Sequence, residues 1–199
     1  MGYITVAELR AFNHDTSALD PGGLQAHIDA ATAKIDGYCG RYFTQDGTAT
    51  ARLFNRLDGC TVIVDDISTT SGLIVKTDRD GSGNYNTTLS STQYVLRPTN
   101  GYLNGLAWPY TSIRTLGNHW FNWAGDYGPE VQVTAKWGWA AVPEPVKAAC
   151  KLIANKLYKS GDAALGVAGF GEFGSVTVRD LPDVAALLAP YRKTAVMVA

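Results

Sequence analysis

The sequence predicts an α+β protein: a small helical bundle with an inserted, mostly antiparallel β domain. Three observations carry this prediction. Residues 130–137 alternate polar and apolar side chains, which is the period of a strand with one wet face. After Pro145 the apolar residues recur at helical spacing instead. Between residues 44 and 138, short alternating runs separated by Gly, Asp, Asn and Ser replace the helical stripes found at both ends. We therefore expect a helical core from residues 1–43 and 139–199, and an inserted β domain from 44–138.

The composition favours a globular protein without a dedicated nucleic-acid surface. Of 199 residues, 46% are hydrophobic and 18% are charged, which is typical of a folded chain. The net charge of −1 lacks the basic excess of nucleic-acid binders. The three cysteines, Cys39, Cys60 and Cys150, are widely spaced, so we expect reduced thiols. No signal peptide or bilayer-spanning run is recognisable, and we expect a soluble, intracellularly made protein with no membrane partner.

Two helices are predicted at the N-terminal end. Thr5 and Glu8 match a capping box, which predicts a short helix over Val6–Phe12. Asp20-Pro21 suits the start of a second helix, with a capping carboxylate followed by proline. Gly40 is placed to end that helix in the left-handed conformation. The apolar face of the second helix is predicted to contain Leu24, Ile28, Ala31, Ile35 and Tyr38.

The β domain is predicted from alternating runs. The expected strands are Thr50–Phe54, Cys60–Val64, Leu73–Thr77, Tyr85–Leu89, Gln93–Leu96, Ile113–Leu116 and Val131–Trp137. Asn100–Gly128 is too irregular for assignment, but it is rich in aromatic residues. Within it, Trp120 and Trp123 are the candidate exposed pair, whereas the alternation places Trp137 in the core.

The C-terminal part returns to helices. A helix from Pro145 to Tyr158 is expected to bury Val146, Cys150, Ile153 and Leu157, which lie at positions i, i+4, i+7 and i+11. A loop should follow at Ser160–Asp162, then a glycine-rich run and a short strand over Val176–Arg179. Leu181-Pro182-Asp183 opens a last helix, which Pro190 must end or kink. The remaining tail is partly apolar, and we expect it to be frayed or to await a partner.

No motif predicts catalysis, a cofactor or a metal site. Gly169–Gly174 matches G-x-G-x-x-G but lacks the preceding strand and following helix of a dinucleotide site, so a connector is the better interpretation. Asp78–Asn84 resembles the start of a calcium loop, yet Leu89 stands where the bidentate acid belongs, and a hairpin turn explains the same residues. The histidines His14, His27 and His119 show no metal-ligand spacing.

Several segments together resemble a known family. These are Tyr3–Leu9, Ala30–Phe43, Gln93–Pro98, Val131–Trp139 before Pro143, and Gly169–Gly174. In order and spacing they resemble the head-to-tail connector (adaptor) proteins of long-tailed bacteriophages, the HK97-type connector family, in a larger form with a β insert.

The resemblance implies a structural virion protein rather than an enzyme, without a cofactor. Such a protein forms a ring, typically a dodecamer, below the portal; it bridges capsid and tail, binds the next neck protein (the stopper) and lines the channel through which double-stranded DNA passes. The implied localisation is the head–tail neck of the virion, with the host cytoplasm before assembly. The C-terminal segment of the family helps to dock on the portal, which here points to Pro190, Tyr191, Arg192, Lys193, Val196, Met197 and Val198.

A ring subunit needs apolar flanks for closing contacts and loops that order on assembly. The candidate assembly loop contains Gly166, Gly169, Phe170, Gly171, Phe173 and Gly174. The alternative hypothesis is a carbohydrate- or protein-binding recognition module that uses Trp120 and Trp123.

Overall fold

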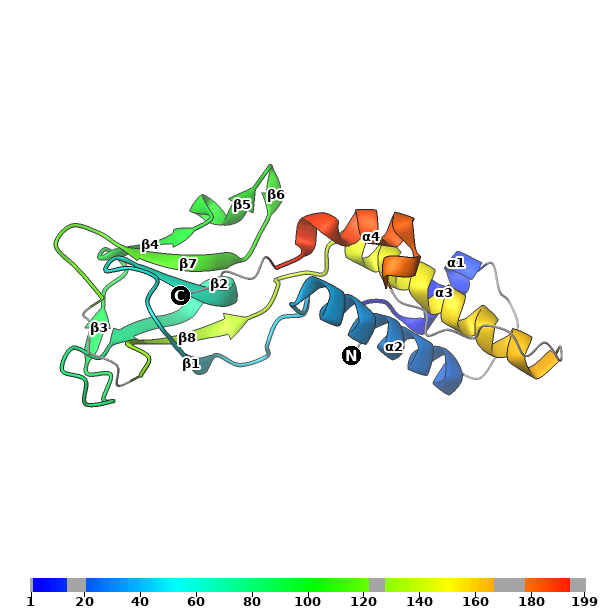
Figure 1. Ribbon diagram of the computed structural model, residues 1–199, viewed down its shortest axis with the longest axis horizontal. Helices are drawn as coiled ribbons and strands as arrows, with labels where there is room; N and C mark the ends of the chain where they lie inside the picture. The colour runs from blue at the N-terminus through cyan, green and yellow to red at the C-terminus, as the bar shows by residue number, and fades with distance from the viewer. Residues whose placement is uncertain (1, 14–20, 122–127, 167–177, 194–199) are drawn as a thin grey trace. The chain divides into compact units, whose positions relative to one another are not determined.

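The computed structural model describes residues 2–13, 21–121, 128–166 and 178–193, and these form two compact units (Figure 1). The helical unit contains the described residues up to Phe43 and from Val142 onward. The β unit contains the described residues of Thr44–Ala141. Helices and an antiparallel sheet in separate segments of the chain confirm the predicted α+β class. The division into a helical connector core of residues 1–43 and 139–199 with an inserted β domain of residues 44–138 stays a prediction.

The helical unit is built on two long helices. Its elements are α1 (Val6–Asn13), α2 (Pro21–Cys39), α3 (Glu144–Gly166), α4 (Pro182–Leu188) and the short 3-10 helices η2 (Val178–Asp180) and η3 (Ala189–Tyr191). The buried residues of α2 are Leu24, Ile28, Ala31, Ile35 and Cys39, and those of α3 are Val146, Ala149, Cys150, Ile153 and Ala154. The predicted faces are therefore confirmed except at their ends, where Tyr38 and Leu157 are only half-buried. None of the helices in the described ranges is long and apolar enough to cross a membrane.

The capping box at the start of α1 is confirmed. The Thr5 hydroxyl accepts a hydrogen bond from the Glu8 backbone N–H at 3.2 Å, and the Glu8 carboxylate accepts one from the Thr5 N–H at 2.7 Å. These donors have no partner within the helix, so each side chain satisfies a group that the helix itself leaves open. The donated hydrogen bonds also lower the pKa of Glu8.

We expect Thr5→Ala to reduce the free energy of unfolding of the helical unit by about 1 kcal/mol, the usual cost of losing a polar N-cap. Urea unfolding followed by circular dichroism at 222 nm measures the change. Thr5→Ser keeps the hydroxyl and is the matched control. Equal midpoints for the alanine and serine variants would show that the cap contributes nothing.

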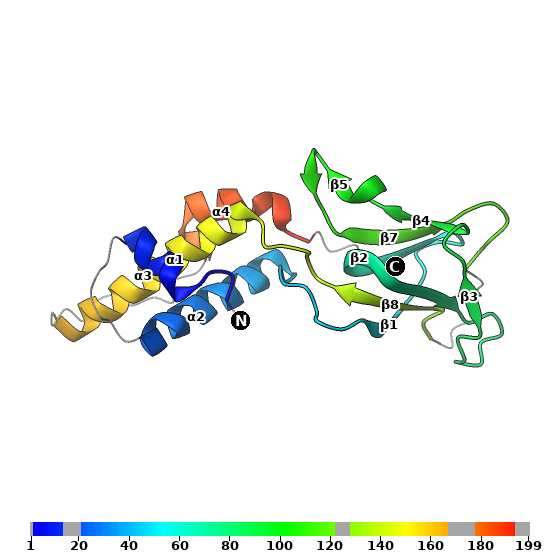
Figure 2. The same ribbon diagram turned by 180° about the vertical axis from the view of Figure 1, so that it is seen from behind.

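The β unit is an antiparallel sheet. Its strands are β1 (Thr50–Phe54), β2 (Thr61–Thr77), β3 (Thr87–Leu89), β4 (Tyr94–Arg97), β7 (Tyr110–Thr115) and β8 (Val131–Trp137), and β5 (Tyr102–Leu103) with β6 (Leu106–Ala107) forms a separate hairpin. In the described residues the sheet order is β1-β8-β2-β7-β4, with β3 paired to the end of β2. The edges of this path are therefore β1 and β4. Figure 2 shows the same arrangement from behind.

One long strand replaces two predicted ones. The runs Cys60–Val64 and Leu73–Thr77 belong to the single strand β2, whose first part pairs with β7 and whose second part pairs with β8. The register is irregular between Ile63 and Ile74, where pairing with β7 on one side of β2 ends and pairing with β8 on its other side begins. The prediction of a break between the two runs was wrong, although the hairpin formed by β2 and β3 is confirmed.

Two further predictions near the C-terminal end were wrong. The predicted loop Ser160–Asp162 lies inside α3, which continues to Gly166. The predicted strand Val176–Arg179 ends in a 3-10 helix at Val178, and its first two residues lie outside the described part of the chain. The final helix is confirmed as α4, and Pro190 lies in η3 immediately after it.

Candidate interaction surfaces

The segment after α4 packs onto the helical unit. Tyr191 is buried, and its ring meets Phe43 edge to face with 5.8 Å between centroids. The Lys193 backbone N–H donates to the Cys39 carbonyl at 2.7 Å, so the chain is held at the end of α2. The Arg192 guanidinium lies 5.1 Å from the centre of the Tyr38 ring, a cation–π distance. The expectation of a loose tail is thus wrong for its first residues.

The portal-docking role of this segment stays a prediction. Exposed Pro190 and Arg192 belong to the described chain. Val196, Met197 and Val198, the apolar part of the candidate docking tail, lie outside the described residues. The described part of the tail, which runs to Lys193, packs on the helical unit through Tyr191 and the Lys193 backbone.

Tyr3 holds Phe43, the residue on which Tyr191 of the tail packs. Its hydroxyl donates to the Asp36 carboxylate and accepts a hydrogen bond from the Phe43 N–H at 2.9 Å. Burial raises the pKa of Tyr3 above its ordinary value, so the phenol keeps the proton that it donates. The Tyr3 ring meets Phe43 at 5.7 Å, and Phe43 is therefore held between two tyrosine rings.

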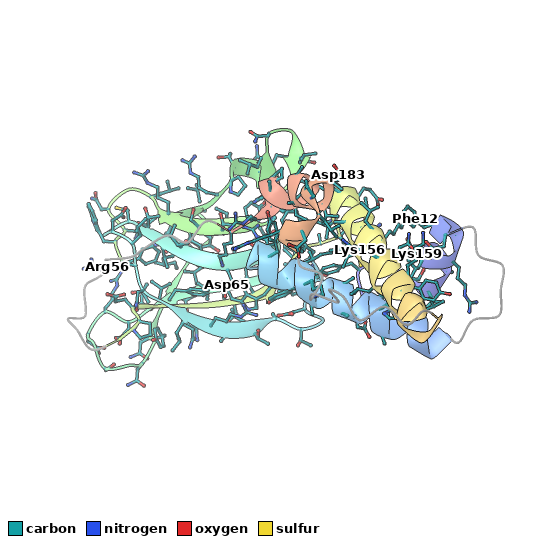
Figure 3. All side chains as sticks on the ribbon, turned by 45° about the vertical axis from the view of Figure 1, so that its right-hand side comes forward. Phe12, Arg56, Asp65, Lys156, Lys159 and Asp183 are labelled. Atoms are coloured by element: carbon teal, nitrogen blue, oxygen red, sulfur yellow. The ribbon has the colours of Figure 1, made fainter. Side chains whose placement is uncertain are left out.

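A basic pocket of about 560 Å³ lies beside this segment in the helical unit. Its lining comes from α2, η2 and the residue after η3: Lys34, Gly37, Tyr38, Val178, Arg179, Asp180 and Arg192. Three cationic side chains and one carboxylate make the pocket suited to an anionic group. Lys156 and Lys159 are exposed on α3 and are not among the residues that line this pocket (Figure 3).

The candidate assembly loop falls almost entirely outside the described residues. Gly166 is the last residue of α3. Gly169, Phe170, Gly171, Phe173 and Gly174 are not described, so the role of this loop stays a prediction.

Of the two candidate exposed aromatics, Trp120 is 54% exposed, as predicted. Its ring covers Gly59, where an added Cβ would lie 3.2 Å from the indole. Trp123 lies outside the described residues, and no binding role of either tryptophan is tested. Trp137 is fully buried, which confirms its prediction as a core residue.

A hairpin with large exposed apolar side chains follows the edge strand β4. In β5 and β6, Tyr102 is 60% exposed, Leu103 is 41% exposed and Leu106 is 53% exposed. The turn between the strands is Asn104-Gly105, with φ of 51° and 78°. Positive φ at both positions is what a tight two-residue hairpin requires. Sequence reasoning missed this hairpin because its strands have only two residues each, although Asn-Gly is a strong turn signal.

The other end of the sheet also exposes apolar side chains. Leu53 on β1 is 50% exposed and Ile74 on β2 is 43% exposed. β8 lies between them: Leu53 is opposite Gln132, and Ile74 is opposite Thr134. Directly paired residues and residues two apart share a face, so these side chains lie on one face of the sheet. The opposite face of β8 buries Val131, Val133, Ala135 and Trp137.

The Asp78 carboxylate and the thiols of Cys39 and Cys150 lie in structural surroundings. Asp78 accepts hydrogen bonds from the backbone N–H groups of Asp80, Gly81 and Gly83, so its carboxylate organises the hairpin turn. Burial raises the pKa of the Cys39 and Cys150 thiols to about 11, which disfavours the reactive thiolate. Within the described ranges no three His, Cys, Asp or Glu side chains are grouped to hold a metal ion.

The comparisons with known proteins give a fold relationship. No protein-family model and no curated protein sequence matches the chain. Three solved structures contain similar chains: the neck of an empty gene transfer agent (GTA) particle computed with C6 symmetry (TM-score 0.60, 18% identity), the neck of the native GTA particle computed with C12 symmetry (0.56, 20%) and the virion of the native GTA particle (0.57, 19%). The similarity covers 98–99% of this chain and 91–93% of the others. At these identities it shows that the helical unit and the β unit together have the fold of a chain from a phage-like particle.

Proposed function

We propose that this protein is a non-enzymatic structural component of the neck of a phage-like particle. In this role it is the head-to-tail connector (adaptor), a subunit of a ring, with twelve copies below the portal. The ring bridges capsid and tail, contacts the next neck protein (the stopper) and surrounds the channel through which double-stranded DNA passes. It assembles from subunits made in the host cytoplasm.

One observation carries the proposal: the fold similarity to GTA neck chains is nearly end to end on both sides. A similarity confined to the helical unit or to the sheet would indicate only a common module. Coverage of both units is what a shared role in the same kind of assembly predicts. The C12 and C6 symmetries of those necks support ring formation by this chain.

The near-neutral charge of the chain suits a subunit that surrounds a DNA channel. Seventeen basic and eighteen acidic side chains leave the subunit almost neutral. Affinity for DNA rises with the number of phosphates that cationic side chains neutralise. A channel through which DNA must slide works best without many such contacts, so a near-neutral subunit suits it.

The test is to purify the subunit alone and together with the portal protein of the same particle, and to examine both samples by native mass spectrometry and negative-stain electron microscopy. We expect a ring of twelve subunits on the portal, whether or not the free subunit is a monomer. The same assembly should lack measurable turnover of small molecules. A subunit that never associates with the portal, with itself or with a neck complex would contradict the proposal.

A further inference from the structure

We infer that the β5–β6 hairpin of one subunit docks on the exposed sheet face around Leu53 and Ile74 of a second copy. This inference rests on the proposed ring and names the contact that would close it. We call residues 102–107 the hairpin arm, and the exposed face that carries Ala51, Leu53, Thr134 and Ile74 the edge face.

The hairpin arm has the composition of an interface. Leu103 is paired directly with Leu106, so two leucine side chains share one face of the ribbon beside the turn. No charged residue occurs between Arg97 and Arg114. A two-stranded hairpin is marginally stable by itself in water, and this one leaves its large side chains exposed. The hairpin arm is therefore expected to gain stability by packing against another surface.

The charge pattern excludes one class of partner for the hairpin arm. Binding to nucleic acid depends on cations that contact phosphates. The arm offers only apolar and neutral polar groups, so it does not fit the DNA of the proposed channel. Its complement must be another uncharged, partly apolar protein surface.

The edge face supplies such a surface on the same chain. No charged residue occurs between Asp46 and Arg52, or between Asp66 and Lys76. These two stretches meet, since Ala49 lies 3.9 Å from the position that a Cβ on Gly72 would take. Leu53, just after the first stretch, and Ile74, within the second, are its large apolar residues. Its borders carry two cations: Lys76 opposite Gln132, and Lys136, which lies two residues from Thr134 on the same face of β8.

The positions of the two surfaces favour a second copy as the occupant. The edge face includes β1, one edge of the sheet, whereas the hairpin arm follows β4, the other edge. A contact between two different surfaces of identical subunits is heterologous, and it generates a closed ring when the rotation between copies closes. Surfaces at opposite edges of one sheet allow every copy to engage two neighbours. The arm is small, so we expect it to act as one part of a larger subunit contact.

The experiment uses full-length protein with the portal, and compares Leu106→Glu on the hairpin arm with Leu53→Glu on the edge face. Each variant should reduce ring assembly at least about tenfold, since a buried carboxylate without a partner is strongly unfavourable. Leu116→Glu, at a position that is 41% exposed in the same unit, is the control and should assemble normally. Tryptophan fluorescence and circular dichroism establish that every variant is folded.

Mixing the two glutamate variants distinguishes a heterologous contact from one in which the same surface of both copies meets. The two defective variants retain one intact surface each, so their mixture should give dimers where neither gives oligomers alone. In a Cys60→Ser background, Leu106→Cys and Leu53→Cys provide a milder version: only the mixture should form a disulfide-linked dimer on oxidation.

The outcomes separate the inference from the proposed function. Wild-type rings together with normal assembly of both glutamate variants would overturn the inference and leave the function standing. Loss of assembly by the arm variant alone, without loss by the edge-face variant, would assign the arm to a different protein and would also overturn it. A wild-type chain that never assembles would overturn both.

Discussion

Removing residues after Ala189 is expected to lower the free energy of unfolding of the helical unit by about 3–5 kcal/mol. The truncation deletes Tyr191, whose ring is only 5% exposed and packs on Phe43. It also deletes the Lys193 N–H, the hydrogen-bond donor to the Cys39 carbonyl at the end of α2. Loss of a buried aromatic ring leaves a cavity that the surrounding helices fill only in part, and this accounts for most of the expected cost.

The matched control is truncation after Lys193, which keeps all of these contacts. Urea unfolding followed at 222 nm should give wild-type stability for this longer chain and a clearly lower midpoint for the shorter one. Tyr191→Phe retains the ring and should be close to wild type. If both truncated chains unfold at the wild-type midpoint, Tyr191 contributes no packing energy. If both are destabilised equally, residues beyond Lys193 hold the unit together.

The two truncations also separate folding from docking. The sequence predicted a tail that is frayed or awaits a partner, and the packing of Tyr191 argues against this for the first residues of the tail. A chain that ends at Lys193 should fold normally and, if the tail docks on the portal as predicted, should bind the portal poorly. A chain that ends at Ala189 would lose both folding stability and the docking tail, so its portal binding could not be interpreted.

Local sequence patterns correctly predicted the elements that are specified by interactions between neighbouring residues in the chain. The capping box at Thr5 predicted the start of α1, and strict alternation predicted β8 to its last residue, Trp137. Gly40 ends α2 with a φ of 64°, as its position after the apolar face indicated. In each case the deciding interactions lie within a few residues of chain, so the sequence pattern contains them.

The prediction of a break within β2 was wrong because interactions between residues far apart in the sequence stabilise this strand. Asp65 and Asp66 directly follow the predicted strand Cys60–Val64, where a break was expected, yet both lie inside β2. The Asp65 carboxylate accepts a hydrogen bond from Arg52 at 2.8 Å, and Asp66 accepts one from the Trp139 indole N–H at 3.0 Å. These partners satisfy charges that would otherwise disfavour a half-buried strand. No pattern near Asp65 indicates them.

The same difference between local and long-range interactions decides which candidate surfaces the sequence could predict. The exposure of Trp120, which lies in the irregular, aromatic-rich segment Asn100–Gly128, was predicted. The hairpin arm and the edge face depend on which strands form the edges of the sheet, and strand order comes from pairing between distant segments. Leu53 and Ile74 share a face only because β8 pairs with β1 on one side and with β2 on the other, in the observed register. A surface that exists only after pairing could not be recognised beforehand.

We expect Trp137→Ala to lower the free energy of unfolding of the β unit by about 3–5 kcal/mol, the usual cost of deleting a buried aromatic side chain. Trp137 is fully buried at the end of β8. Its indole N–H donates to the Thr50 carbonyl at 2.9 Å, and the Arg52 guanidinium lies 4.6 Å from its ring centre. The substitution therefore removes a large apolar surface, a hydrogen bond to β1 and a cation–π contact together.

The distribution of tryptophan makes this prediction specific to one unit. All five tryptophans occur between residues 108 and 139, within the β unit, whereas the long helices that dominate the signal at 222 nm belong to the helical unit. Urea unfolding of Trp137→Ala should show an earlier transition in tryptophan fluorescence. Trp120→Ala makes the same chemical change at a 54% exposed position and should alter the midpoint little. Equal destabilisation by the two variants would contradict the core role of Trp137. A shift of the same size in the fluorescence and 222 nm transitions of Trp137→Ala would show instead that the helical and β units unfold as one cooperative structure.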